Sequence, residues 1–287
     1  DQQANDYVRD QIHQAKNGLM VSKWGTTELG TVCSLLSDDL HIPLKDIYEG
    51  KVSYDRTGSV AWLVNNSGFF PNSLPAGEKF AHLALEDARE IDILGSYAKL
   101  EYYVRNYTEK ARKINLNGYY APFLWENPWT KELKGKKVLV VHPFAETIKK
   151  QYDKREHLFE NPDVLPEFKK LTVIKAVQSI AGNSSETGFK DWFEALDFMK
   201  NQMDQSDYEI ALIGCGAYGM SLAAHAKRHG KIAIHMAGWT QMLFGIYGNR
   251  WIKDQPEFKK YINEYWTRPS IDERPKNVEK VEGGCYW

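Results

Sequence analysis

Short apolar runs alternate with amphipathic segments along the chain, and this alternation predicts the order of its elements. The apolar runs, each short enough for a buried strand, are 19–24, 91–94, 137–141, 171–177, 208–213 and 231–236. Helical spacing of apolar residues predicts helices at 4–17, from Thr26 or Thr27 onward, and at 79–90, about 145–156, 189–203 and 217–229. Strands that alternate with helices indicate an α/β fold. We therefore expect a Rossmann-like, mainly parallel sheet with helices on both faces.

Two stretches lack a clear period. Residues 43–78 carry Pro, Gly and Asn around one short apolar segment, 60–64. Residues about 97–135 are rich in Tyr and Trp and are interpreted as an irregular, aromatic-rich insertion. No linker and no internal repeat is evident, so we expect a single Rossmann-like domain over 1–287.

Polar residues and glycines gather at the ends of the predicted strands. In an open parallel sheet, ligands bind beyond the carboxyl ends of the strands, so these positions are candidate site residues. They are Gly25, Thr26, Thr27 and Glu28 after the first strand, His142 and Glu146 after the third, Gly214 to Gly219 after the fifth, and His235 in the last.

A glycine pattern follows the strand at 208–213. Gly214, Gly216 and Gly219 match G-x-G-x-x-G between a strand and a helix, with Ala217 and Tyr218 in the same loop. Such a loop lets the backbone approach a pyrophosphate, whose charge the helix N-terminus stabilises. A tight turn that packs the helix on the strand explains the same pattern without a ligand. A dinucleotide site would also need an acidic residue at the end of the next strand, where Ile234-His235-Met236 stands, so a nucleotide diphosphate fits better than NAD.

Two carboxylates, Glu28 and Glu146, open helices beyond strand ends. Either suits a general base or a ligand of a divalent cation, although an acid in a first helical turn also stabilises the helix dipole. His142 is the third catalytic candidate, with a purely structural role as the alternative. Arg250, in a loop with Gly and Trp, is a candidate clamp for phosphate oxygens and groups with the donor-binding positions.

Composition narrows the class of protein. The 37 Lys+Arg against 38 Asp+Glu argue against a protein that coats nucleic acid. Three scattered cysteines fit neither a disulfide framework nor a zinc knuckle, so we expect no metal held by cysteines. No apolar run approaches the ~20 residues of a transmembrane segment and no signal peptide is evident, so we expect a cytoplasmic location. The chain begins at Asp1 rather than Met, which is compatible with one domain of a larger protein, and nothing predicts its oligomeric state.

Aromatic residues make up 13% of the chain, which is high for an α/β protein. Core packing accounts for part of this excess. Trp125, Trp129, Trp239 and Trp251 lie in predicted loops instead, and they are candidates for stacking on a sugar or a base.

Several segments resemble a group of polysaccharide-biosynthesis proteins. They are 211–219, 223–225, Gly238, 240–241, 243–245, 250–251, 141–146 and 281–287. From about residue 19 to 287 the chain is similar to glycosyltransferases of the GT-D class, which are Rossmann-like enzymes with nucleotide-sugar donors. The resemblance implies transfer of a hexosyl or deoxyhexosyl group from a nucleotide-diphosphate sugar to a hydroxyl of a glycan acceptor.

One position departs from that family. GT-D enzymes place an acidic D-x-E motif after the first strand, whereas here Thr26 occupies the Asp position and only Glu28 aligns. One carboxylate with a hydroxyl is a weak site for Mn²⁺ or Mg²⁺. A cation held by Glu146 and the donor phosphates is the alternative, but we expect transfer without a metal. Cationic groups and helix N-termini would then stabilise the leaving diphosphate.

Two other functions stay open. The glycine pattern alone also suits an NAD(P)-dependent or other dinucleotide-binding enzyme. The missing Asp at Thr26 is compatible with a non-catalytic module that binds a nucleotide or a glycan.

Overall fold

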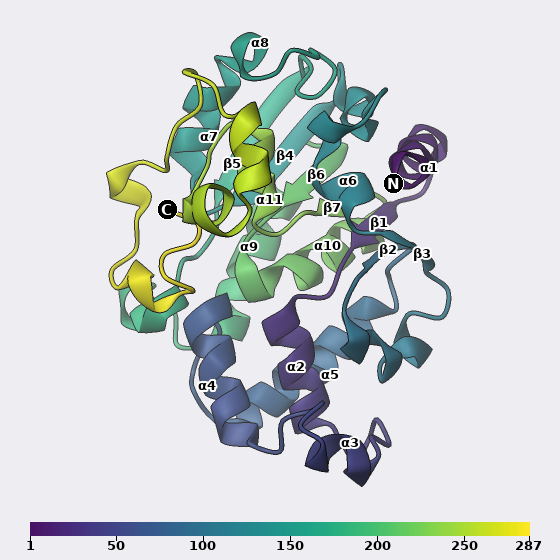
Figure 1. Cartoon of the computed structure of the whole chain (residues 1–287), viewed down its shortest axis with the longest axis vertical. Helices are drawn as coiled ribbons and strands as arrows, with labels where there is room; N and C mark the ends of the chain where they lie inside the picture. Colours follow the sequence, from purple (N-terminus) through teal and green to yellow (C-terminus); the bar gives the residue numbers. More distant parts are fainter.

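The computed structural model describes residues 1–287 and contains one seven-stranded, wholly parallel sheet between two layers of helices (Figure 1). The strands are β1 (Leu19–Ser22), β2 (Ile93–Ser96), β3 (Arg112–Asn115), β4 (Lys137–His142), β5 (Lys170–Lys175), β6 (Ile210–Ile213) and β7 (Ile232–His235). Their order across the sheet is β3-β2-β1-β7-β6-β4-β5. The predicted α/β class with a parallel sheet is confirmed.

Helices cover both faces of this sheet. One layer holds α2 (Thr26–Leu35), α4 (Arg56–Ser67), α5 (Leu74–Ala88), α9 (Trp192–Asp204) and α10 (Gly219–Arg228). The other holds α1 (Gln2–Gln14), α6 (Asn117–Tyr120), α7 (Ala145–Tyr152) and α11 (Trp239–Leu243). Two short helices, α3 (Leu44–Tyr48) and α8 (Arg155–Leu158), complete the set.

Alternating strand residues supply the two cores. In β4, Leu139 and Val141 belong to a 42-residue apolar cluster on the α2/α9/α10 side. Val138 and Val140 belong to a 34-residue cluster on the α1/α7 side. Because successive side chains of a strand point to opposite faces, an apolar run without polar interruptions is what a strand covered on both sides requires.

Two segments differ from the sequence-based expectation. Residues 56–67 form the helix α4, whose N-terminus is capped by the Asp55 side chain, which accepts from Gly58 N at 2.8 Å. Its C-terminus ends at Gly68, with φ of 76°. Residues 112–115, inside the stretch expected to be an irregular insertion, form the edge strand β3. This strand has mostly exposed side chains, so no apolar run marked it.

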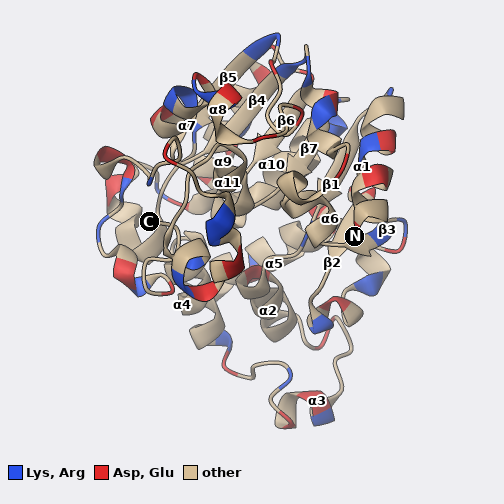
Figure 2. Ribbon diagram, turned by 45° about the horizontal axis from the view of Figure 1, so that its top comes forward, with Lys and Arg blue, Asp and Glu red and all other residues tan.

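Smaller shifts concern element boundaries. β2 begins at Ile93 and includes Gly95, two residues later than predicted. The helix expected over 145–156 ends at Tyr152 and is followed by α8. Lys and Arg are interspersed with Asp and Glu over the outer helices and loops, in line with the balanced charge of the chain (Figure 2).

The topology creates a crevice between β6 and β4. These strands are neighbours, but β6 continues through α10 to β7 on one side, whereas β4 continues through α7 to β5 on the other. The loops that leave their carboxyl ends therefore diverge. In open α/β sheets such a switch point is where ligands bind.

Candidate functional site

A cavity of about 460 Å³ opens at the carboxyl ends of β1, β7, β6 and β4. Pockets of this size accommodate small organic ligands. The predicted site residues that line it are Gly25, Thr26, Thr27, Glu28, His142, Gly214, Gly216, Ala217, Tyr218, His235 and Arg250. The structure therefore brings together residues that are more than 200 positions apart in the chain.

The corner between β1 and α2 forms one wall. Gly25 is the N-cap of α2, and no side chain caps this helix N-terminus. The carboxylate of Glu28 folds back over Gly25, where an added Cβ would lie 1.7 Å from Glu28 Oε2. The Thr26 hydroxyl is 3.1 Å from Tyr97 Oη, and Tyr97 Oη in turn donates to Trp24 O at 2.7 Å.

Lys23 is a site residue that the sequence analysis did not single out. It follows β1 directly, lines the cavity and lies with its Nζ 5.6 Å from the centre of the Tyr97 ring. Burial by itself disfavours its charge, but Tyr120, Tyr97 and Glu28 outweigh this effect and raise the pKa of Lys23 above its ordinary value. Lys23 therefore places a fixed positive charge beside the Glu28 corner. Its position at a strand end is the signal that could have identified it.

The three glycines after β6 are required by contacts within the protein. A Cβ at Gly214 would lie 2.4 Å from Ala237 O, and one at Gly216 would lie 2.6 Å from Ser67 O. Gly216 also has φ of 59°, which favours glycine. Gly219 does not line the cavity; it opens α10 and lets the ring of His235 approach, with Nε2 2.3 Å from an added Cβ. Tight packing thus explains the pattern, and a donor-binding role for the loop stays a prediction.

His142 and His235 end β4 and β7, which flank β6, and both are buried residues that line the cavity. Burial lowers the pKa of each to about 3, with nearby Lys23 contributing at His235, so both rings are neutral. The backbone N–H of Phe144 donates to His142 Nδ1 at 3.0 Å. The proton of His142 therefore resides on Nε2, which makes this atom a hydrogen-bond donor. Ser22 Oγ and His235 Nδ1 form a buried hydrogen bond of 3.0 Å.

Arg250 lines the cavity but is not a free cation. Its guanidinium pairs with Glu282 and lies 4.6 Å from the centre of the Tyr286 ring. Burial opposes its charge, whereas Tyr286, Cys285 and Glu282 favour it and raise its pKa. An anionic ligand would have to share Arg250 with Glu282.

Residues 281–287 form the wall that carries this pair. Arg250 N donates to Cys285 O at 2.8 Å, Asn249 N to Trp287 O at 3.1 Å, and Gln241 Nε2 to Tyr286 O at 3.2 Å. Val281, Glu282, Tyr286 and Trp287 line the cavity. The segment is thus bound to the loop after α11 largely through backbone groups.

Glu146 is not brought to the cavity. Its side chain is 61% exposed and pairs with Lys149 at 2.7 Å, which together with Lys150 and Lys175 lowers its pKa despite a small opposing effect of burial. The N-terminus of α7 is occupied by the Glu273 carboxylate, which accepts from Glu146 N at 2.7 Å and Thr147 N at 3.1 Å. For Glu146 and the donor phosphates to hold a cation, which was the alternative to metal-independent transfer, this side chain would have to leave Lys149 and reach the cavity.

The loop tryptophans divide between core and cavity. Trp129 and Trp251 are fully buried core residues, and Trp125 donates to Asn117 O without reaching the cavity. Trp239 does line the cavity, together with Trp24 and Trp287. Three indoles therefore contribute apolar surface where a flat-faced ligand would lie.

The site combines the carboxylate of Glu28, the charged Lys23 and the N-terminus of α2, which no side chain caps. The two neutral histidines, His142 and His235, complete it. Such a set can transfer a proton at Glu28 and stabilise negative charge at Lys23 and the α2 N-terminus. None of the helices combines the length and apolarity that crossing a bilayer requires. In comparisons with known proteins, no family model, no curated protein and no solved structure matches this chain.

Proposed function

We propose that this protein is a glycosyltransferase that transfers a sugar from a nucleotide-diphosphate-sugar donor to a hydroxyl of a glycan acceptor. The observation that carries the proposal is the convergence of Glu28, Lys23 and the uncapped α2 N-terminus in one cavity at the switch point of the sheet. The resemblance to GT-D-class glycosyltransferases supports the same reaction class.

Lys23 and the α2 N-terminus would bind the donor diphosphate. The N–H groups of the first turn of a helix favour an anion, and the Lys23 charge adds to that field. Glu28 also lies at this helix end, so the diphosphate would occupy the Lys23 side. The neutral Nε2–H of His142 would donate to a phosphate or sugar oxygen.

Glu28 would act as the general base. The acceptor oxygen would attack the anomeric carbon, its proton would pass to Glu28, and the bond from the anomeric carbon to the diphosphate oxygen would break. The electron pair of that bond would remain on the diphosphate, where Lys23 stabilises it.

The residues of the cavity do not fit a resident Mn²⁺ or Mg²⁺ ion. Such ions favour several carboxylate oxygens, whereas Glu28 is the single carboxylate at the α2 corner and Glu282 is paired with Arg250. The Thr26 hydroxyl, which replaces the family's Asp, is engaged with Tyr97. We therefore propose metal-independent transfer.

A thermal-shift panel of UDP, GDP, dTDP and CMP sugars tests donor binding, with NAD and S-adenosylmethionine as the competing classes and each ligand with and without Mn²⁺. A ligand that binds the native state alone raises the unfolding temperature. We expect a nucleotide sugar to give the largest shift without Mn²⁺. A shift with NAD alone would instead favour a dinucleotide-binding enzyme. An unfolding temperature that no ligand changes would contradict the proposal.

Catalysis is then tested by measuring sugar transfer from the donor that binds to each of several glycan acceptors. Glu28→Gln should lower turnover by roughly 10²–10⁴-fold, the usual contribution of a general base. The matched control is Glu146→Gln, since Glu146 also opens a helix after a strand but lies outside the cavity. Equal turnover in both variants would overturn the role of Glu28, and binding without transfer in the parent would indicate a non-catalytic module.

A further inference from the structure

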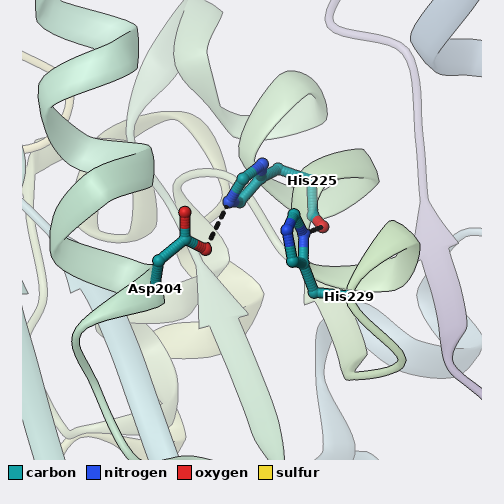
Figure 3. A group of neighbouring side chains, drawn as sticks. All are labelled: Asp204, His225 and His229. Atoms are coloured by element: carbon teal, nitrogen blue, oxygen red, sulfur yellow. Dashed lines mark hydrogen bonds and ion pairs between the residues drawn. The ribbon is translucent and has the colours of Figure 1, made fainter.

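Two histidines and one aspartate meet where α9 and α10 end (Figure 3). Asp204 is the last residue of α9. His225 lies in the last turn of α10, and His229 is its C-cap, one helical turn later. The cluster lies toward the carboxyl end of α10: His225 and His229 are about 6 Å and about 12 Å of helix beyond Ser221, the last α10 residue that lines the cavity, and none of the three residues lines it. It is therefore separate from the site described above.

The ring nitrogens and the carboxylate face a common point. His225 Nε2 is 2.7 Å from Asp204 Oδ1, and one ligand atom from each of the three residues lies within 4.8 Å of the others. Ligand atoms about 2.0 Å from a tetrahedral Zn²⁺ ion are about 3.3 Å apart, so small side-chain rotations bring the three into coordination distance. Asp204 and His229 are exposed, which leaves them free to make those rotations.

His229 already has the orientation of a metal ligand. Its Nδ1 is 2.8 Å from His225 O, and because a carbonyl oxygen only accepts, Nδ1 carries the proton. In the neutral ring the lone pair then resides on Nε2, the atom that coordinates the ion. A metal-bound histidine typically donates its second N–H to a carbonyl or carboxylate in this way, which fixes the ring orientation.

The electrostatic environment favours a cation. The C-termini of α9 and α10 meet here, and unpaired carbonyl groups give each helix C-terminus a partial negative charge. Asp204 adds a full negative charge. Lys200, one turn before Asp204 in α9, pairs with Asp197 at 3.7 Å.

We propose that Asp204, His225 and His229 form a Zn²⁺ site that joins the carboxyl ends of α9 and α10. The ion is bound by Asp204 Oδ1 and the Nε2 atoms of both histidines, and a water molecule takes the fourth position. When the ion binds, the neutral His225 ring changes tautomer: Nε2 gives up its proton and Nδ1 takes one up through solvent, because only the unprotonated nitrogen coordinates. Two imidazoles and one carboxylate form a ligand set typical of zinc and unsuited to magnesium.

Calorimetric titration of Zn²⁺ into the EDTA-treated, full chain tests the site, with Mg²⁺ as the comparison ion. We expect one equivalent of Zn²⁺ to bind with micromolar affinity and Mg²⁺ not to bind at the same concentrations. His229→Gln and Asp204→Asn should each weaken Zn²⁺ binding by about tenfold or more. The three cysteines are buried, so they do not compete for the ion.

The matched control is His82→Gln. His82 is also an exposed histidine near a carboxylate, 3.9 Å from Asp39, but it belongs to no cluster of three potential metal ligands. Zn²⁺ affinity should be unchanged in this variant. Unfolding temperatures in EDTA show that each variant folds, and Zn²⁺ should raise the unfolding temperature of the parent but much less that of His229→Gln. Absence of binding below millimolar Zn²⁺, or equal affinity in His229→Gln and His82→Gln, would overturn the proposal.

Discussion

The carboxylate of Glu28 lies directly over the Cα of Gly25, so close that a Cβ at residue 25 would lie 1.7 Å from Glu28 Oε2. Gly25→Ala should therefore push the Glu28 carboxylate aside. Since this carboxylate ends a flexible side chain, the fold should persist and the base should be misplaced. We expect turnover to fall by about tenfold or more while nucleotide-sugar binding, measured by calorimetry, changes little. Full turnover in Gly25→Ala would show that catalysis does not need Glu28 in this position.

Lys23→Met removes the positive charge of the cavity wall but keeps an apolar stem of similar length. Loss of a charged hydrogen-bond donor should weaken binding of the nucleotide sugar by about tenfold or more. The matched control is Lys79→Met, since Lys79 also lies over an aromatic ring, 4.0 Å from the centre of Phe193, but does not line the cavity. Dissociation constants that agree between the two variants would remove Lys23 from the diphosphate site.

Gly216→Ala should destabilise the fold by about 1–3 kcal/mol, because it combines positive φ with a contact 2.6 Å from a backbone oxygen. Gly50→Ala isolates the first effect, since Gly50 has φ of 71° and open space where the Cβ would be. Gly50→Ala should lower the free energy of unfolding by about 1 kcal/mol. Urea unfolding of both variants measures the difference, and equal losses would show that the approach of Ser67 O to Gly216 is not a tight contact in solution.

Acid should destabilise the protein through its buried histidines. Burial lowers the pKa of His142 from 6.5 to about 3. Between these values the unfolded chain binds more protons than the folded protein, so the free energy of unfolding decreases as the pH falls from 6.5 toward 3. Each such histidine contributes about 1.4 kcal/mol per pH unit.

His142→Asn tests this contribution, because it keeps an acceptor for the Phe144 N–H but does not titrate. Urea unfolding between about pH 4 and 6 should show a slope about 1.4 kcal/mol per pH unit smaller than that of the parent. An unchanged slope would mean that His142 titrates alike in the folded and unfolded states.

The pairing of Arg250 with Glu282 predicts a substitution that improves binding. Glu282→Gln removes the carboxylate that competes with a ligand phosphate for the guanidinium. Nucleotide-sugar affinity should rise by up to about fivefold, the value of a partly exposed ion pair of about 1 kcal/mol. Arg250→Gln should have the opposite effect. Weaker binding in Glu282→Gln would indicate that the carboxylate itself contacts the ligand.

The parallel sheet was predictable because six of its strands coincide with short apolar runs of the sequence. Runs such as 137–141 are short, uninterrupted and bounded by polar residues. This is the pattern of a strand that is buried on both faces, as β4 is. The edge strand β3 was not predicted because it lacks an apolar run. Arg112 and Lys113 are exposed, and the segment is a strand through its pairing with β2.

The cavity was predictable where it depends on strand ends and unpredictable where it depends on side-chain partners. Glu28, His142 and His235 follow from topology alone. The Glu146 side chain pairs with Lys149 outside the cavity, and the α7 N-terminus is occupied by Glu273, which is 127 positions distant. No local pattern encodes such a contact, nor the pairing of Arg250 with Glu282.

Residues 281–287 complete the cavity wall although the scaffold of strands ends at His235. A chain that emerges from the ribosome in order makes all seven strands available before this wall, and domains fold from what has already been synthesised. The cavity is thus completed last, after all seven strands of the sheet have been synthesised. A stalled or clipped chain that lacks this segment would keep all seven strands but lose one wall of the cavity, together with the core side chains Val281 and Trp287. Protein abundance would then be a poor measure of active sites.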